Sequence, residues 1–262
     1  MPRVVDFTHA LVRTPATSVV DGLRMEGGPP PDFAGVLAEH AAYAEALRTA
    51  GVAVEVLPPL PEHPDAIFVE DPALVFTEGA IRLRPGAVSR LGEGAALAPV
   101  LAARFRRVLE LSEGHVDGGD VLVLPGEVLI GRSARTDAAG AAALAGLLGE
   151  LGKTARIVAT PPGTLHLKSA VTLVDEETVL ATAEVGAAGL FPGLRVLTVP
   201  EDERHAANVL RVNAVVLAGN RYPRTLDMLA RHGLVVVPLA VDEIVKIDAG
   251  LTCMSLRWWA DA

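Results

Sequence analysis

The chain has 262 residues, of which 50% are hydrophobic and 21% charged, a composition that excludes intrinsic disorder and allows a large core. Its 23 basic and 32 acidic residues leave a net charge of −9, which disfavours a surface that follows the phosphates of DNA or RNA. The single cysteine, Cys253, excludes an intramolecular disulfide. Because the start resembles no signal peptide and no apolar stretch is long enough for a bilayer span, we expect a cytoplasmic protein that binds neither membranes nor nucleic acid.

The predicted elements follow one another in a recurring order along the chain. A strand at 7–15 precedes a helix over 32–51, which Asp32 can cap and Gly51 can end. Two apolar strands joined by a tight turn, a pattern typical of a hairpin, recur at 66–86, 115–136, 164–184 and 206–225. Further helices are predicted over 93–107, 137–152 and 223–232, and further strands at 52–59, 155–162 and 234–240. The last segment, 248–259, looks like half a hairpin whose partner strand is 7–15.

The repeated unit is therefore hairpin, helix and strand. Equivalent points fall near 69, 119, 168, 209 and 253, a spacing of roughly 41 to 50 residues that is typical of a supersecondary repeat. Five such units predict a closed α/β ring formed by a single domain over 1–262, with one position of every repeat facing a common axis. The alternative is a doubly wound sheet, which would contain single strands in place of hairpins.

Chemically useful side chains occur where the first strand of each hairpin begins. These residues are Glu70, Asp71, Asp117, Asp120, His166, Asn208 and Cys253. A cysteine attacks carbon only as the thiolate and so needs a cationic partner, for which His166 is a candidate. The alternative is a small buried thiol and a structural histidine on a strand, with Lys168 on the same face.

Several carboxylates near one axis require a compensating cation, which could be a metal, an arginine or a positively charged substrate. The sequence has none of the common metal-binding motifs, whereas paired carboxylates suit a planar guanidinium. Arg90 and Arg135 follow hairpins and are either surface charges or ligands of a carboxylate at the other end of that substrate. The substrate so described resembles arginine, and neither a metal nor an organic cofactor is expected.

Eight segments of the chain resemble the dimethylarginine dimethylaminohydrolase family of the guanidine-modifying superfamily. They are RTPATSVVDGL (13–23), FVEDPALVF (68–76), RPGAVSR (84–90), HVDGGDVL (115–122), GRSARTD (131–137), LHLKS (165–169), NRYPRT (220–225) and KIDAGLTCMSLR (246–257). The resemblance implies a five-bladed α/β propeller, or pentein, with a central site. It also implies hydrolysis of mono- and dimethylarginine to citrulline and a methylamine through a covalent thiouronium on cysteine.

The resemblance further implies a role for each matching residue. Cys253 would be the nucleophile, His166 the general acid and base, and Asp117 the residue that orients His166 or the guanidinium. The implied substrate-binding residues are Asp65, Glu70, Asp71, Arg90, Arg135, Val19 through its carbonyl group, and Ile247. Two positions differ from relatives, since Val19 replaces leucine and Asp117 replaces the glutamate of some members. A thiolate beside imidazole and carboxylates would also be sensitive to zinc.

Three alternatives remain open from the sequence. The first is another guanidine-modifying hydrolase that acts on arginine, agmatine or citrulline. The second is a non-enzymatic five-fold ring, and the third is a protein that binds methylated arginine without turnover. The sequence also leaves a homodimer open.

Overall fold

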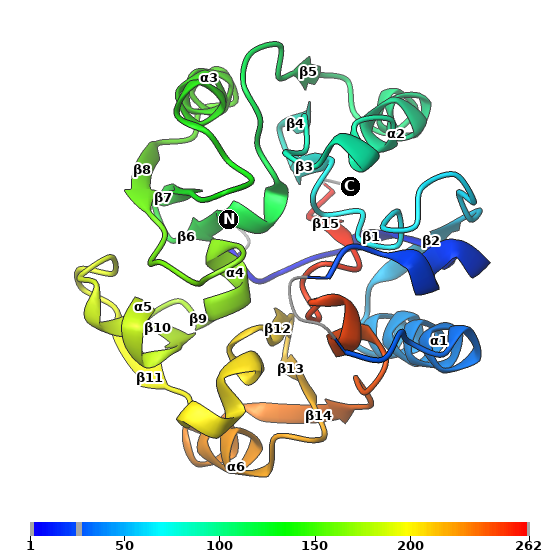
Figure 1. Cartoon of the computed structure of the whole chain (residues 1–262). Coiled ribbons are helices and arrows are strands. Elements are labelled where there is room, and N and C mark those ends of the chain that lie inside the picture. The colour runs from blue at the N-terminus through cyan, green and yellow to red at the C-terminus, as the bar shows by residue number, and fades with distance from the viewer. Residues whose placement is uncertain (1–2, 25–27, 261–262) are drawn as a thin grey trace.

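The chain forms five three-stranded sheets that surround a central axis, with helices on the outside of the ring (Figure 1). The computed structural model describes residues 3–24 and 28–260. In every sheet the middle strand pairs antiparallel with the first strand and parallel with the third. A helix connects the middle strand to the third strand, so each blade repeats the predicted unit of hairpin, helix and strand. The fold is therefore a five-bladed α/β propeller, and the doubly wound alternative is wrong.

Both chain ends contribute to one blade, as predicted. Its first strand is β15 (Leu256–Trp258), its middle strand β1 (His9–Arg13) and its third strand β2 (Ala53–Leu57). β1 is antiparallel to β15, so pairing of the last strand with the first closes the ring. Closure leaves no gap between the first and last blades, where sheet edges would otherwise be exposed.

The other four blades follow in chain order. They consist of β3 (Ala73–Phe76), β4 (Gly79–Arg82) and β5 (Val108–Glu110); β6 (Val121–Leu124), β7 (Glu127–Arg132) and β8 (Ala155–Ala159); β9 (Val171–Asp175), β10 (Thr178–Ala181) and β11 (Arg195–Thr198); and β12 (Leu210–Val212), β13 (Val215–Gly219) and β14 (Val235–Leu239). Left-handed residues make two of the tight turns, Gly126 with φ 85° and Asn213 with φ 51°. Such a backbone suits glycine and asparagine, which is why these residues signal hairpins in the sequence.

The outer helices are α1 (Phe33–Thr49), α2 (Glu93–Ala102), α3 (Ala138–Glu150), α5 (Ala183–Ala187) and α6 (Pro223–Arg231). Asp32 caps α1 by accepting a hydrogen bond from the Gly35 N–H at 2.8 Å, and Asp137 caps α3 in the same way. The apolar core is divided into clusters between neighbouring blades and under these helices. The axis itself is left for polar side chains. Among the described residues, no helix combines the length and the apolar character needed to cross a membrane.

Short helical turns that the sequence did not predict precede four of the first strands, and two more, η1 (Thr17–Asp21) and η2 (Val88–Arg90), follow the middle strands β1 and β4. The four are η3 (Gly118–Asp120), α4 (Leu167–Ala170), η4 (Glu201–Ala207) and η5 (Ile244–Ile247). His166 was expected on a strand, but it is the residue before α4, and its strand β9 begins only at Val171. The apolar residues Leu167 and Ala170 are buried on one side of α4, which is a helical spacing that a four-residue segment does not reveal in the sequence.

Candidate active site

Two adjacent glycines, Gly118 and Gly119, allow separate blades to approach each other closely at one end of the central channel. We call this end of the channel the front. A Cβ atom on Gly118 would lie 2.0 Å from the carbonyl oxygen of Glu70. A Cβ atom on Gly119 would lie 2.7 Å from Nδ1 of His166 and 3.0 Å from Oδ1 of Asp71. No larger residue fits either position without displacing the backbone or the imidazole. The VDGGD sequence thus allows carboxylates of one blade to approach the histidine of another.

His166 is held by the neighbouring blade. Its Nε2 lies 3.0 Å from Oδ2 of Asp117, which is completely buried and also accepts a hydrogen bond from the Gly86 N–H at 2.7 Å. Burial alone would lower the pKa of His166, but the hydrogen bond to Asp117 and the negative charge of Asp71 raise it to about 9. His166 is therefore protonated at neutral pH, and its Nδ1 makes no hydrogen bond with a described residue.

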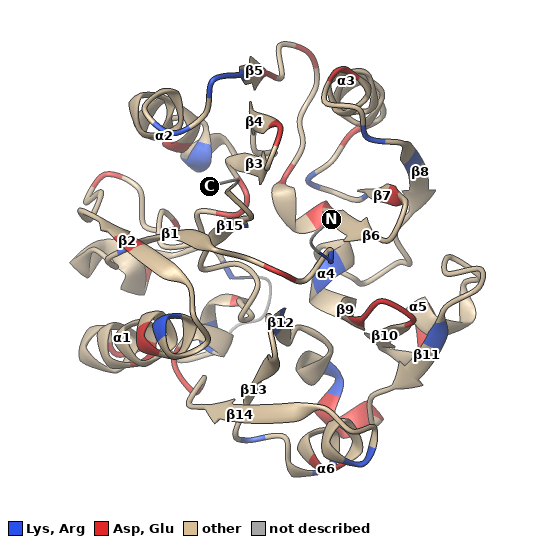
Figure 2. Cartoon of the chain, turned by 180° about the vertical axis from the view of Figure 1, so that it is seen from behind, with Lys and Arg blue, Asp and Glu red and all other residues tan. Residues whose placement is uncertain are grey.

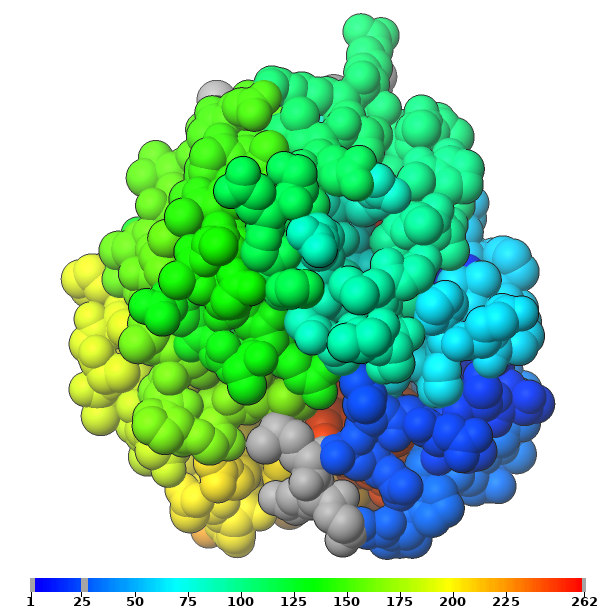
Figure 3. All heavy atoms as spheres, turned by 45° about the horizontal axis from the view of Figure 1, so that its top comes forward, coloured from blue at the N-terminus to red at the C-terminus, as the bar shows by residue number. Residues whose placement is uncertain are grey.

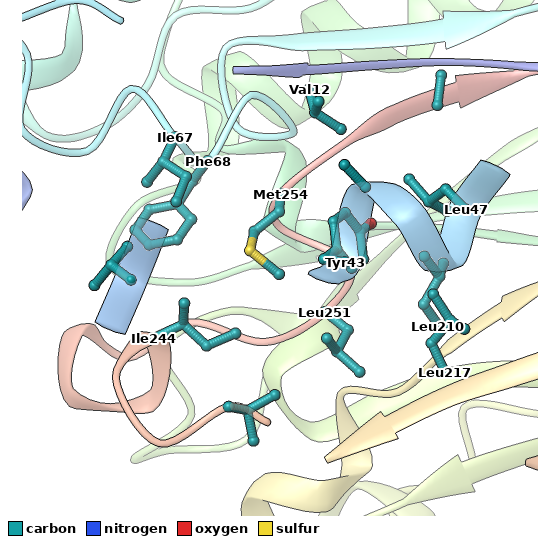
Figure 4. Packing of buried hydrophobic residues seen from close by; sticks show 14 of the residues in the cluster. Val12, Tyr43, Leu47, Ile67, Phe68, Leu210, Leu217, Ile244, Leu251 and Met254 are labelled. Atoms are coloured by element: carbon teal, nitrogen blue, oxygen red, sulfur yellow. The ribbon is translucent and has the colours of Figure 1, made fainter. Parts of the chain in front are cut away.

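Cys253 lies in a turn just before β15, and the residues on both sides of it are anchored. Met254 is 1% exposed and packs in the apolar cluster that Figure 4 shows. The Thr252 N–H donates to Oδ1 of Asn208 at 3.0 Å, and the carbonyl of Cys253 accepts from the Glu70 N–H at 3.2 Å. The Cys253 side chain itself is half-buried, so the thiol is held at a fixed place yet stays accessible.

The thiol is surrounded by negative charge. Burial, followed by the charges of Glu70 and Asp71, raises the pKa of Cys253 to about 11. The amide Nδ2 of Asn208 lies 3.7 Å from Sγ. Because Oδ1 of Asn208 already accepts from the Thr252 N–H, the amide must present its N–H side to the sulfur. A neutral thiol and a protonated imidazole are therefore the resting state of this site.

Asp71 connects the two groups electrostatically, since its charge raises the pKa of both Cys253 and His166. The Asp71 carboxylate accepts a hydrogen bond from the Gly119 N–H at 2.9 Å and is only 4% exposed. Glu70 lies beside it, and its Oε1 pairs with Nζ of Lys168 at 2.7 Å. The structure thus brings the predicted acids, thiol and imidazole together at one end of the channel.

Arg90 is buried among acids, and its expected contact with a substrate carboxylate stays a prediction. It is 4% exposed, and its guanidinium donates to the carboxylates of Asp71 and Glu93. It also donates from Nη2 to the carbonyl oxygens of Asp65 and Phe68, at 3.1 and 3.0 Å. All three guanidinium nitrogens are engaged, so the observed role of Arg90 is to neutralise the buried acids. Binding of a substrate carboxylate by Arg90 would require at least one of these contacts to be shared.

A second cluster lies beside η1. A Cβ atom on Gly22 would lie 3.1 Å from the Val19 carbonyl oxygen, 3.2 Å from Oδ1 of Asp65 and 3.5 Å from Cγ2 of Ile247. Asp65 accepts a hydrogen bond from the Leu23 N–H at 3.0 Å. Burial raises the pKa of Asp65, and the charges of neighbouring arginines only partly oppose it. In Figure 3 the blue N-terminal residues stand at the rim of a hollow, and red C-terminal residues are seen in its depth.

Arg135 is half-buried and follows the hairpin of β6 and β7. Its side chain makes no ion pair with any residue in 3–24 or 28–260, and its charge lowers the pKa of Asp65. Of the two predicted arginines, Arg135 is the one with an uncommitted guanidinium. The expected carboxylate contact is therefore better supported for Arg135 than for Arg90.

Three potential metal ligands also meet here. One atom each of Asp71, Asp117 and His166 lies within 4.8 Å of the others. Asp71 is already paired with Arg90, and Asp117 with His166. These pairs account for the charges without a metal ion, and the expectation that none is required stays a prediction.

Three residues that contact this site carry no functional signal in the sequence. Asn208 marks only the start of a repeat, and Lys168 is only a neighbour of His166. Glu93, the partner of Arg90, belongs to no motif. A buried ion pair between segments distant in the chain leaves no local pattern, and the close approach of Gly250 to Asn208 is visible only in the folded chain. A Cβ atom on Gly250 would lie 2.1 Å from the Asn208 side chain.

Comparison with known proteins agrees with this geometry. The N(G),N(G)-dimethylarginine dimethylaminohydrolase of Pseudomonas aeruginosa is 38% identical to the chain over 254 residues, which are 96% of the chain and all of that protein. The protein of the same name from Streptomyces coelicolor is 36% identical over 252 residues, covering 95% and 96% of the two chains. The chain belongs to the dimethylarginine dimethylaminohydrolase family. A family model described as arginine deiminase matches residues 99–203.

Solved structures of the dimethylarginine dimethylaminohydrolase family superimpose closely on the chain. A cysteine-to-serine variant of the Pseudomonas aeruginosa enzyme, in complex with citrulline, has a TM-score of 0.93 and 37% identity over 96% of this chain and 99% of that one. The N-terminal domain of a cyanobacterial arginine dihydrolase has a TM-score of 0.85 at 17% identity, over 96% of this chain and 98% of that one. At that identity the second likeness concerns the fold alone.

Proposed function

We propose that the protein hydrolyses N-omega-methylated arginines to citrulline and methylamine or dimethylamine. The observation that carries this proposal is the arrangement of one accessible thiol and one protonated imidazole around Asp71. The Pseudomonas aeruginosa relative, whose cysteine-to-serine variant was solved with citrulline bound, supports the product. Cys253 is the single cysteine of this chain and is therefore the residue proposed to carry the intermediate.

Substrate binding divides between the two clusters. The guanidinium is placed against Asp71 and Asp117, whose carboxylates form charge-assisted hydrogen bonds and hold the positive charge on the guanidinium. The α-amine at the other end of the substrate suits Asp65 and the Val19 carbonyl, next to Ile247. The α-carboxylate suits the uncommitted guanidinium of Arg135, while Arg90 keeps the acidic segment neutral enough to fold.

Thiol activation follows from the charges. With a pKa of about 11, Cys253 is mostly protonated at neutral pH, and His166 is itself protonated and cannot act as its base. A bound cation offsets Glu70 and Asp71, the two acids that raise the thiol pKa. Substrate binding therefore favours the thiolate, which the amide N–H of Asn208 stabilises.

The first half-reaction forms a bond between Sγ and the guanidinium carbon, and the C=N electron pair moves to nitrogen. The tetrahedral adduct then collapses, its C–N bond to the methylated nitrogen breaks, and His166 gives its proton to the departing amine. The product on the enzyme is an S-alkylthiouronium. Nδ1 of His166 is the proposed proton carrier because Nε2 is bound to Asp117.

The second half-reaction returns the enzyme to its starting state. Neutral His166 takes a proton from water, and the resulting hydroxide adds to the thiouronium carbon. Collapse of this adduct breaks the C–S bond, and the proton of its hydroxyl group passes to the departing sulfur, which leaves the neutral Cys253 thiol and the C=O group of citrulline. Each proton that His166 gives in the first half is recovered in the second, so no cofactor takes part.

The test is a product assay combined with mass spectrometry. Purified protein incubated with asymmetric dimethylarginine should release citrulline and dimethylamine in equal amounts, and rapid acid quenching should show an amidino adduct on the peptide that contains Cys253. Parallel incubations with arginine and agmatine measure ammonia release, which would reveal one of the other guanidine hydrolases. Absence of both citrulline and adduct from every substrate would contradict the proposal.

We also propose that all five blades act as one catalytic domain over 1–262, because the site takes side chains from several blades. The cytoplasmic location and the homodimer stay predictions. A crosslinking or light-scattering experiment in solution would test the dimer.

A further inference from the structure

The channel has a second chamber behind the site, on the face where the hairpin turns lie. It is a cavity of about 530 Å³, within the range of small-molecule sites. The segment before β1 crosses this face, as Figure 2 shows from behind, and its residues line one side of the chamber. The apolar wall includes Phe7, Val75, Val123, Leu173, Leu210 and Trp258. We call this cavity the rear chamber.

The rear chamber and the front site are separated by a buried ion-pair group. Oε1 of Glu70 pairs with Nζ of Lys168 at 2.7 Å and with Nη2 of Arg257 at 3.1 Å. Glu70 and Lys168 are 4% and 8% exposed. These three residues form the floor of the rear chamber. On the other side, the charge of Glu70 raises the pKa of Cys253.

Among the residues that the structure describes, the charges inside the rear chamber do not balance. Two cations on its floor, Lys168 and Arg257, share the single carboxylate of Glu70. Arg211 adds a third cation, and it makes no ion pair with any residue that the structure describes. Its Nε donates only to the carbonyl oxygen of Asn213, at 2.9 Å.

Other features of the two arginines also favour an added anion. Nη1 of Arg257 donates to carbonyl oxygens of Thr252 and Ser255 and Nη2 pairs with Glu70, whereas its buried Nε has no hydrogen-bond partner among the described residues. Burial and the nearby charge of Arg3 lower the pKa of Arg211, and the charges of Asp175 and Asp6 only partly oppose this, so a further negative charge beside Arg211 would be favourable. The remaining charges at the rim cancel in pairs, Arg3 with Asp6 and Lys153 with Glu78.

We propose that the rear chamber binds a small apolar carboxylate whose anionic group pairs with Arg211 and is attracted by the charge of Arg257. The largely apolar wall requires a hydrophobic body, which free phosphate or sulfate lacks. The surplus of positive charge disfavours an arginine-like cation, so this ligand differs from the substrate proposed for the front site. The rear chamber is thus a second binding site for a molecule of the opposite charge.

Tryptophan fluorescence gives a direct measurement of occupancy. The chain has two tryptophans, and both Trp258 and Trp259 line the rear chamber. Titration of the full chain with 4-phenylbutanoate should change the emission in a saturable way. The neutral analogue 4-phenylbutan-1-ol, which has the same apolar body, should bind about tenfold more weakly because it lacks the charge-assisted contacts.

Two variants test whether the ligand binds in the rear chamber. Arg211→Gln should weaken 4-phenylbutanoate binding about tenfold, whereas Arg231→Gln, whose parent side chain is 82% exposed on α6, should leave it unchanged. Should Arg211→Gln fail to fold, Val123→Glu places a negative charge on the half-buried wall and should abolish binding. Circular dichroism of each variant verifies the fold.

Three results would overturn the proposal. They are a titration that does not saturate, equal binding of the alcohol and the acid, and release of 4-phenylbutanoate by citrulline. The last result would place the acid at the front site. Because this readout needs no turnover, failure of the rear-chamber proposal and failure of the proposed hydrolase activity are distinguishable.

Discussion

The front site, which is formed by residues in the turns before the first strands, and the rear chamber, which the first strands line, carry opposite charge. At the front, Asp71, Asp117 and Asp120 raise the pKa of one imidazole against the opposing effect of burial, whereas burial, Glu70 and Asp71 together raise the pKa of the Cys253 thiol. At the rear, Arg211 and Arg257 line an apolar cavity in which, among the described residues, cations outnumber acids. The channel of this protein therefore offers two different sites, and the sign of the local charge determines which ligand each end favours.

The largest expected effect is the loss of activity when the proposed nucleophile of the front site is replaced. Cys253→Ser should reduce citrulline formation from dimethylarginine by about 10⁴-fold or more, because a serine hydroxyl is scarcely ionised here and no base is available to it. Calorimetry should show that the variant still binds dimethylarginine. Retention of more than a tenth of the wild-type rate would exclude Cys253 as the nucleophile.

A change in Asp71 should alter both ionisable groups together. Asp71→Asn removes a negative charge that raises the pKa of Cys253 and of His166, so both pKa values should fall. The initial rate of alkylation by iodoacetamide at pH 8 should therefore rise, while kcat/KM falls about a hundredfold because the guanidinium loses a charged partner.

These opposite changes distinguish an electrostatic role of Asp71 from general damage to the fold. A misfolded site would lose turnover without a defined shift of the alkylation pH profile. If alkylation of Asp71→Asn had the same pH dependence as the wild type, the electrostatic link between Asp71 and the thiol would be wrong.

Substitution of Asn208, whose amide lies beside the same sulfur, should have a smaller effect on the rate of turnover. Asn208→Ala should lower kcat about tenfold with little change in KM, because one N–H contact to the thiolate is lost and no substrate contact changes. Asn208→Asp has the same shape but puts a carboxylate beside Sγ, so it should raise the thiol pKa and be slower than the alanine variant. Equal rates for the two variants would show that Asn208 acts only through packing.

Stability should depend on pH in opposite ways at two buried histidines. The folded-state pKa of His166 is raised to about 9, so its contribution to the free energy of unfolding is complete below the ordinary pKa of about 6.5 and is lost as pH rises through 9. His40, on α1, has its pKa lowered to about 4 by burial, so stability declines as pH falls from about 6.5 towards 4.

Urea unfolding between pH 4 and 10 measures both trends. His166→Gln should remove the decline above neutral pH, with an effect of roughly 1–3 kcal/mol, and leave the acid side unchanged. His40→Gln should do the reverse. A wild-type curve that is flat from pH 7 to 10 would contradict the charged state of His166.

The smallest expected effect comes from the rear chamber. Arg211→Gln should keep kcat and KM for dimethylarginine within about twofold of the wild type, since the ion-pair group of Glu70, Lys168 and Arg257 remains intact. Steady-state kinetics measure this directly. A large loss of activity would mean that the front and rear ends do not act separately.

Sequence patterns predicted the propeller because its signals are local and repeated. Apolar strands, turn residues such as Asn213 and caps such as Asp32 each act over a few residues, and repetition of the unit makes the pattern visible. The position of His166 before a four-residue helical turn was missed, because so short a helix shows no periodicity. Strand pairing of the two chain ends was predictable only because one half-hairpin was left at each end.

The sequence by itself therefore determined the repeating unit, the closure of the ring and the identity of the thiol, the imidazole and the acids that meet at its axis. The tertiary structure alone decided how those charges pair. Only the folded chain shows that Arg90 is committed to Asp71 and Glu93, that Asn208 contacts Sγ, and that Glu70 separates an acidic site from a cationic chamber. The physical reason is that electrostatic pairing depends on distance and burial in space, which residues far apart in the chain do not encode locally.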